Sequence, residues 1–341
     1  MKPLVIHQTD LFHSNHNDPD DHWDLACQYA LAFLGYIQLE GVVIDYPPIV
    51  FGDPSIQAVN QLNYITGKYV PVAVGTSEAM TACKDYSPCR GFVPEFSGVN
   101  LILDTLEKSE SGVIIHIVGS CRDVAIASKI NPSLFKEKCK AIYLNAGASS
   151  PDSEPEYNVG LDPYSYSCIF GIDCPIYWMQ CFEHAPKAPE WEFKMGQYGT
   201  FYKFEQGEIL PYLSEKMQNY FIYALGNVTD SKWLSYLKNT VNKRMLDYYC
   251  QVGRSMYSTA GIFHGAGKSV TRDGELTDHC DAGEDAVFTF EPVELSCSQK
   301  GFVKWNITEK DTNRFIFKVK DLSKYPSAMT KAMKSLLTKI P

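Results

Sequence analysis

The sequence predicts an α/β fold, a mostly parallel open sheet with helices on both faces. Short runs of β-branched and other apolar residues alternate with segments of helical periodicity over residues 1–185, which is typical of a parallel sheet that is buried on both faces. The chain has 341 residues, of which 45% are hydrophobic, enough for one large core. We expect a single domain over residues 1–341, in which a helical cover and C-terminal strands and helix (186–341) complete the α/β core.

Six apolar runs are predicted as strands of this sheet: residues 4–6, 41–44, 69–74, 112–118, 141–144 and 175–178. Helices are expected between them over residues 22–34, 54–66, 99–108 and 122–130. After residue 185 the pattern predicts helices at 210–225 and 231–250, a polar loop at 261–283, antiparallel strands within 287–320 and a helix at 327–339. Ligands of open sheets bind outside the carboxyl ends of the strands, so residues that follow the strands are site candidates.

Charge and composition narrow the class of partner. The formal net charge is -9 and the isoelectric point is near 5.4, which argues against a nucleic acid and favours a small neutral or cationic ligand. The eleven cysteines include no C-x-x-C pair, so they indicate no zinc site. No apolar stretch is long enough to span a membrane. The start of the chain does not resemble a signal peptide, which predicts a cytoplasmic protein, or a secreted or periplasmic one if a leader has been removed.

An acidic run after the first predicted strand is the most informative feature of the chain. Its five aspartates are Asp10, Asp18, Asp20, Asp21 and Asp24. Ca²⁺ takes six to eight oxygen ligands, mostly carboxylates and carbonyls, and an acidic loop between a strand and a helix supplies several. Aspartates also cap the first turn of helices, where they favour the positive end of the dipole. Five aspartates together favour a metal site over helix capping alone.

Three later segments occur in a characteristic order. They are Gly112 to Ala127 (GVIIHIVGSCRDVAIA), Lys140 to Gly147 (KAIYLNAG) and Glu156 to Pro163 (EYNVGLDP). Together with the acidic N-terminal strand, they resemble the inosine-uridine nucleoside hydrolase family over roughly residues 1–185. The resemblance implies a Ca²⁺-dependent enzyme that hydrolyses the N-glycosidic bond of a nucleoside, and it implies a homodimer or homotetramer.

The same resemblance implies roles for individual residues. Asp10 and Asp21 would be metal ligands together with the backbone carbonyl of Val118. Asp20 would be the general base that takes a proton from the metal-bound water. Glu156 and Asn158 would bind the ribose, and Asn145, at the end of a predicted strand, is a further substrate-binding candidate. From the residues alone, Glu156 and Asn158 also fit a polar surface loop.

The chain departs from the family pattern in its acidic loop. Nine residues, 11–19, separate Asp10 from Asp20, whereas three separate the corresponding aspartates of the family. In an alternative register Asp18 would be the first ligand, at the cost of crowding three carboxylates into four residues. The additional residues include His13 and His16, which either are solvated or contact the ligand or a softer metal.

A second departure lies in the C-terminal half. The family has a His-Asp pair, in which the histidine assists the leaving group and the aspartate is the last metal ligand. The nearest match here is His264-Gly265, so we expect His264 to be catalytic and the aspartate to be missing. Either another carboxylate completes the metal site, or the metal has fewer ligands, or no metal binds. The candidates are Asp273, Asp278, Asp281, Glu284 and Asp285.

Hydrolysis of an N-glycosidic bond explains this set of residues. Its transition state resembles an oxocarbenium ion, so the site must stabilise positive charge on the sugar and activate a water molecule. A bound Ca²⁺ would position that water and lower its pKa. Two alternatives remain open. One is a catalytically altered protein of the same fold that binds a nucleoside or sugar; the other is a metal-dependent phosphoesterase, for which Arg122 is the one evident phosphate-binding candidate.

Overall fold

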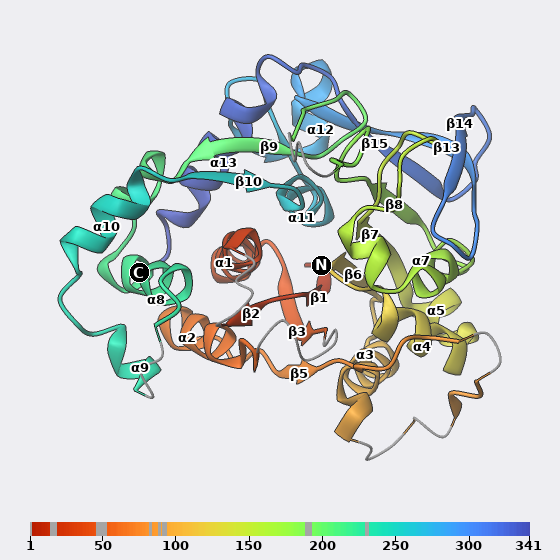
Figure 1. Ribbon diagram of the computed structural model, residues 1–341, viewed down its shortest axis with the longest axis horizontal. Helices are drawn as coiled ribbons and strands as arrows, with labels where there is room; N and C mark the ends of the chain where they lie inside the picture. Colours follow the sequence, from red (N-terminus) through yellow and green to blue (C-terminus); the bar gives the residue numbers. More distant parts are fainter. Residues whose placement is uncertain are drawn as a thin grey trace.

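The computed structural model describes residues 2–13, 19–45, 53–81, 84–87, 90, 94–187, 193–228 and 232–341. A nine-stranded sheet runs through the centre of these residues (Figure 1). Its strands, in spatial order, are β14 (Val303–Ile307), β13 (Phe288–Cys297), β15 (Arg314–Val319), β8 (Ile176–Met179), β7 (Cys139–Asn145), β6 (Val113–Val118), β1 (Leu4–Thr9), β3 (Gln38–Ile44) and β5 (Val72–Val74).

The sheet is mostly parallel, as predicted. The pairs from β15 through β8, β7, β6, β1 and β3 to β5 are all parallel, while β13 pairs antiparallel with both β15 and β14. The C-terminal strands therefore extend the sheet that the first 185 residues begin. Strand β1 lies between β6 and β3, which places the residue that follows it, Asp10, near the middle of the carboxyl edge.

Helices cover both faces of the sheet, which confirms the predicted fold class (Figure 1). One face carries α1 (Pro19–Leu34), α2 (Ile56–Thr66), α8 (Glu215–Leu225), α11 (Thr259–Gly265) and α13 (Tyr325–Leu337). The other carries α3 (Ser97–Lys108), α4 (Arg122–Ile130), α5 (Pro132–Lys138) and α7 (Pro163–Ile169), with the short α6 (Tyr157–Leu161) before α7. Each set buries its own apolar cluster against the sheet.

The sequence pattern is less accurate after residue 185. The predicted helix at 210–225 is a 3-10 turn, Leu210–Tyr212, followed by α8, because the Ser214 side chain caps α8 at Met217 N. The prediction at 231–250 contains two helices, α9 (Trp233–Tyr236) and α10 (Lys243–Cys250), and the Asn242 side chain caps the second. The predicted loop at 261–283 holds the end of α11, the pair β11 (Lys268–Val270) and β12 (Leu276–Asp278), and α12 (His279–Ala282).

Two further pairs of short strands lie outside the central sheet. Strands β9 (Tyr202–Glu205) and β10 (Gly253–Met256) pair antiparallel and lead into α11. Strand β2 (Phe12–His13) pairs antiparallel with β4 (Asp53–Pro54), so the backbone of His13 lies in a strand. His16 and Asp18, which the sequence analysis considered, lie outside the described residues.

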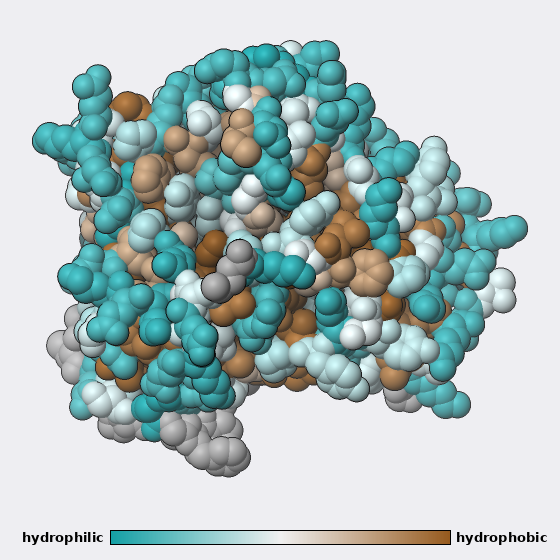
Figure 2. All heavy atoms as spheres, turned by 180° about the vertical axis from the view of Figure 1, so that it is seen from behind, coloured by the Kyte–Doolittle hydropathy of each residue, from teal (hydrophilic) through white to brown (hydrophobic). Residues whose placement is uncertain are grey.

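On the face turned away in Figure 1, hydrophilic residues cover most of the surface, and hydrophobic residues form scattered patches between them (Figure 2). Within the described ranges, no helix has the length and apolar character needed to cross a membrane.

Helix α11 packs very closely on the sheet. Gly261 and Gly265 are four residues apart and so lie on one face of the helix. A Cβ atom at Gly265 would lie 2.6 Å from His116 Nε2 and 3.3 Å from a ring carbon of Tyr143, and one at Gly261 would overlap Met179. The two glycines therefore set how near this helix comes to β6, β7 and β8.

We expect Gly265→Ala to lower the free energy of unfolding by about 1–3 kcal/mol, because the buried His116 ring cannot move away without disturbing the sheet. Urea unfolding would measure the change. Gly160→Ala is the matched control: Gly160 lies in α6, and a Cβ there would meet nothing within 4 Å. Equal effects of the two substitutions would contradict close packing of α11.

Candidate active site

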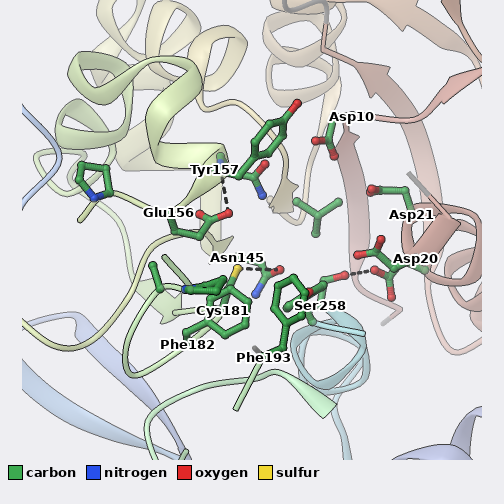
Figure 3. A pocket seen from close by; sticks show the side chains of 17 residues that line it. Asp10, Asp20, Asp21, Asn145, Glu156, Tyr157, Cys181, Phe182, Phe193 and Ser258 are labelled. Carbon is green, nitrogen blue, oxygen red and sulfur yellow. Dashed lines mark hydrogen bonds between the residues drawn. The ribbon is translucent and has the colours of Figure 1, made fainter. Parts of the chain in front are cut away.

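A pocket of about 430 Å³ lies at the carboxyl edge of the parallel sheet, a volume suited to a small organic ligand. Figure 3 shows Asp10, Asp20 and Asp21 on one side of it, and Glu156 and Tyr157 on the opposite side. The residues that line it are Asp10, Asp20, Asp21, Asp24, Val118, Asn145, Pro155, Glu156, Tyr157, Asn158, Cys181, Phe182, Ala185, Pro186, Phe193, Tyr257 and Ser258. The structure thus brings together every site residue that the sequence predicts except His264.

Two elements supply the acidic side of the pocket. Asp10 directly follows β1, and Asp20 and Asp21 lie in the first turn of α1. Asp10 and Asp21 are both 3% exposed, and the Thr9 hydroxyl donates a 2.6 Å hydrogen bond to Asp21 Oδ1. The aspartates therefore occupy a helix start and line a pocket at once, so the two interpretations of the acidic run are compatible.

The turn after β6 holds the acidic side against the sheet. Val118 ends β6 and lines the pocket. At the next residue, Gly119, a Cβ atom would lie 3.0 Å from the backbone nitrogen of Asp10 and 2.6 Å from Asp45 Oδ1. Asp45 follows β3, and its other oxygen accepts a hydrogen bond from Ser120 N at 2.9 Å. The close approach of the two turns fixes Asp10 beside Val118.

The three polar candidates on the other side differ in how they are bonded. Both oxygens of Glu156 accept backbone hydrogen bonds, from Gly147 N at 2.8 Å and from Asn158 N at 2.9 Å, so Glu156 caps α6. Asn145 donates from Nδ2 to Met179 O and Thr200 Oγ1, and the Cys181 thiol approaches its Oδ1 at 3.9 Å. Asn158 Oδ1 is buried and has no hydrogen-bond partner within the described residues.

Asp24 also lines the pocket, one helical turn after Asp20. Its side chain is 1% exposed, and its Oδ2 accepts a hydrogen bond from Ser258 Oγ, at the start of α11. Burial raises the pKa of Asp24 to about 7, although the Ser258 hydrogen bond opposes that rise. This link between α1 and α11 was not expected from the sequence.

Aromatic rings form a further wall of the pocket. Phe182, Phe201, Phe193 and Tyr257 pack with Cys181 in one cluster. The ring centroid of Phe182 lies 5.6 Å from that of Phe193 and 5.5 Å from that of Tyr257, and these three rings line the pocket. They come from separate segments of the chain, so no local motif could have revealed them.

His264 lies at the opposite end of α11 from Ser258, and it does not line the pocket. Its Nδ1 is hydrogen-bonded to the Tyr143 hydroxyl at 2.7 Å, and its ring packs against His279 with centroids 4.3 Å apart. Burial lowers the pKa of His264 to about 3, and the neighbouring His279 adds to that effect. His264 comes six residues after Ser258, about 9 Å further along the helix axis.

The five acidic residues considered as replacements for the missing ligand also lie elsewhere. None of Asp273, Asp278, Asp281, Glu284 and Asp285 is among the described residues that line the pocket. Three of them form ion pairs instead: Asp278 with Lys268, Glu284 with Lys320 and Asp285 with Arg272.

Arg122 does not face the pocket either. It is 1% exposed, and its guanidinium donates to Ser120 Oγ and to the carbonyls of Thr76 and Ser77. Asp162 Oδ2 lies 3.8 Å from its Nε. These contacts hold the turns after β5 and β6 together and leave the phosphate-binding role of Arg122 without support.

The donor types in the pocket fit a hard cation. Within the described parts of the chain, no three His, Cys, Asp or Glu side chains already converge as a metal site. The pocket nevertheless offers four aspartates and the Val118 segment on one side, and oxygen donors of this kind are those that Ca²⁺ prefers. Asp24 lines the same pocket, and one of its oxygens is buried and has no hydrogen-bond partner among the described residues.

No protein-family model matches the chain, and no curated protein sequence matches it. Solved structures do resemble it. A plant nucleoside hydrolase superposes with a TM-score of 0.57 at 12% identity, covering 98% of this chain and 100% of the other. An inosine-guanosine nucleoside hydrolase gives 0.56 at 14% identity, with 99% of each chain covered. A purine-preferring ribonucleoside hydrolase from Gardnerella vaginalis gives 0.52 at 15% identity, covering 98% and 99%. The chain therefore has the nucleoside hydrolase fold.

The environment of His264 predicts a dependence of stability on pH. Because its folded pKa is below its unfolded value of 6.5, the unfolded chain binds a proton first, and stability falls as the pH drops below about 6.5. We expect His264→Asn, which keeps an acceptor for Tyr143, to reduce the stability lost between pH 7 and pH 5 by about 2 kcal/mol. Urea unfolding at both pH values tests this, with the exposed His184→Asn as control. An unchanged pH dependence would contradict the expectation.

Proposed function

We propose that this pocket hydrolyses the N-glycosidic bond of a ribonucleoside or related N-riboside in a Ca²⁺-dependent reaction that releases the base and ribose. The observation that carries the proposal is that one pocket joins an acidic strand edge, amide and carboxylate groups suited to sugar hydroxyls, and an aromatic wall. The nucleoside hydrolase fold supports the same reaction class, because several structures that share it are named as nucleoside hydrolases.

The electrostatics of the pocket favour this chemistry. Five carboxylates line it: Asp10, Asp20, Asp21, Asp24 and Glu156. An oxocarbenium-like transition state carries positive charge on the sugar ring, and oriented negative groups in a largely buried site stabilise such charge strongly. The ground-state nucleoside is neutral at that carbon, so the field acts mainly on the transition state.

Asp10 and Asp21, with the backbone carbonyl of Val118, would hold the metal ion. When bound, Ca²⁺ would lower the pKa of a water molecule and fix its position. Asp20 lies in the first turn of α1 beside these residues, and it would take the proton from the attacking water. The Thr9 hydroxyl holds Asp21 by its Oδ1, which keeps that carboxylate oriented toward its role.

The opposite side of the pocket would bind the sugar. Asn158 Oδ1, which has no partner within the described residues, would accept a hydrogen bond from a ribose hydroxyl. Asn145 has both of its donated bonds directed at Met179 and Thr200, so its Oδ1 would act as an acceptor. Glu156 keeps lone pairs beyond those used by the two backbone amides.

The aromatic wall would hold the base. Phe182, Phe193 and Tyr257 present flat, polarisable surfaces to the pocket, and planar bases stack on such rings. In this arrangement the sugar would lie between the acidic side and the Asn145–Asn158 side, and the base would lie against the rings.

Hydrolysis of a purine and pyrimidine nucleoside panel, followed as reducing-sugar release with Ca²⁺ and with chelator, tests the function. We expect Ca²⁺-dependent release, and Asp20→Asn should lower kcat by about 10²- to 10⁴-fold, the usual contribution of a positioned base. The exposed Asp247→Asn on α10 is the control. Binding of nucleosides without any release would instead support a catalytically altered binding protein.

Removal of the Asn158 amide should act differently. We expect Asn158→Ala to lower kcat/KM about tenfold, mainly by raising KM, because a hydrogen bond to a sugar hydroxyl is made in the ground state as well. Asn306→Ala, on the exposed part of β14, should leave both constants unchanged. A Michaelis constant that stays at the wild-type value would rule out sugar binding by Asn158.

A further inference from the structure

Asp24 lines the pocket, and the reaction proposed above gives it no individual role beyond its share of the negative charge. It lies three residues after Asp21 and four after Asp20 on α1, spacings that place all three near one side of a helix. Its carboxylate is 1% exposed and lines the pocket with them. Within the described residues, its Oδ1 has no hydrogen-bond partner, while its Oδ2 accepts from Ser258 Oγ.

A structural role does not explain this arrangement. A buried carboxylate with an unsatisfied oxygen destabilises a folded protein, and such groups are retained when something else binds them. The contact with Ser258 uses one oxygen of Asp24 and leaves the other without a hydrogen-bond partner in the described part of the chain. Asp24 lines the same cavity as Asp10, Asp20 and Asp21.

The other end of the contact is equally informative. Among the described residues after 200, those that line the pocket are Tyr257 and Ser258, at the start of α11. The family resemblance implies a metal-binding aspartate in the C-terminal half, which is missing beside His264, and the residue of that half that borders the acidic side of this pocket is Ser258. The Ser258 hydroxyl points at a carboxylate from α1, so negative charge is present at this place but comes from the opposite helix.

We propose that Asp24 is a metal ligand of this pocket and that Ser258 is the positioning residue that orients its carboxylate. The inference rests on the proposed Ca²⁺ site and names the residue that completes it. Asp10, Asp21 and Asp24 with the Val118 carbonyl form an all-oxygen set, and the remaining positions of a six- to eight-coordinate Ca²⁺ would be taken by water and sugar hydroxyls. The cation supplies the partner that Asp24 Oδ1 lacks.

Calcium binding to the chelator-stripped protein, measured by titration calorimetry, tests the assignment independently of activity. We expect Asp24→Asn to weaken Ca²⁺ binding at least tenfold, while Asp247→Asn, at an exposed position of α10, binds as the wild type does. Without calcium, Asp24→Asn should melt no lower than the wild type, because it removes a buried charge; with calcium, its melting temperature should rise less. A structural role predicts the reverse: a lower melting temperature and unchanged calcium binding.

An exchange of the two side chains gives a second test. In the double variant Asp24→Ser/Ser258→Asp, the carboxylate comes from α11 and the hydroxyl from α1. We expect this variant to bind Ca²⁺ at least fivefold more tightly than Asp24→Ser alone, because the charge returns to the same place. No recovery, in a double variant whose thermal unfolding remains cooperative, would contradict the assignment.

The outcomes separate this inference from the proposed function. If the wild type binds Ca²⁺ and hydrolyses nucleosides while Asp24→Asn binds within threefold of it, the assignment of Asp24 is wrong and the function stands. If the wild type binds no Ca²⁺, both the metal dependence and the ligand role of Asp24 are overturned. If Ca²⁺ binds through Asp24 but no nucleoside is cleaved, the ligand assignment stands and the hydrolase proposal fails.

Discussion

The concentration of carboxylates at the carboxyl edge of the sheet is the constraint on which the site depends. Asp10, Asp20, Asp21, Asp24 and Glu156 surround one pocket, and several of them are nearly excluded from water. Such a group of like charges is costly unless a cation or a developing positive charge enters it. The fold tolerates this cost because the aspartates lie at the ends of elements whose apolar faces are buried elsewhere: β1 inside the sheet, and α1 against α2, α8, α11 and α13.

The close packing of α11 on the sheet is the second constraint on which the pocket depends. Gly261 and Gly265 let the helix lie directly on Met179, His116 and Tyr143, and this close contact brings Ser258 to Asp24 at the other end of the helix. The same packing encloses His264, whose ring contacts Tyr143, Tyr177 and Phe290. One helix therefore contributes to the pocket through its start and to the core through its end. His264, in the last turn, packs against aromatic rings, and Ser258, at the start of the helix, lines the pocket.

The sequence predicts the pocket residues whose positions depend only on the strand or helix that carries them. Asp10, Val118 and Asn145 follow or end strands, and Asp20 and Asp21 begin a helix, so alternation of strands and helices placed them correctly at one edge. Ser258 and the aromatic wall depend on which distant segments meet, and a single sequence carries no signal for that. The sequence pattern predicts a loop from residue 261, and glycine is a poor helix former; packing of α11 on the sheet stabilises the helix there instead. The sequence places Asp24 in the acidic run, but it gives no indication that Ser258 is its hydrogen-bond partner.

The long spacing between Asp10 and Asp20 shows why a motif can be interrupted without losing its geometry. Asp10 is fixed by β1 and by the close turn at Gly119, while Asp20 is fixed by α1. Neither position depends on the length of the chain between them. The first residues of that chain are themselves anchored, because Leu11 and Phe12 are buried and β2 pairs with β4. Packing therefore fixes the chain on both sides of the acidic loop, so the carboxylates converge on one pocket although the sequence between them differs from the family pattern.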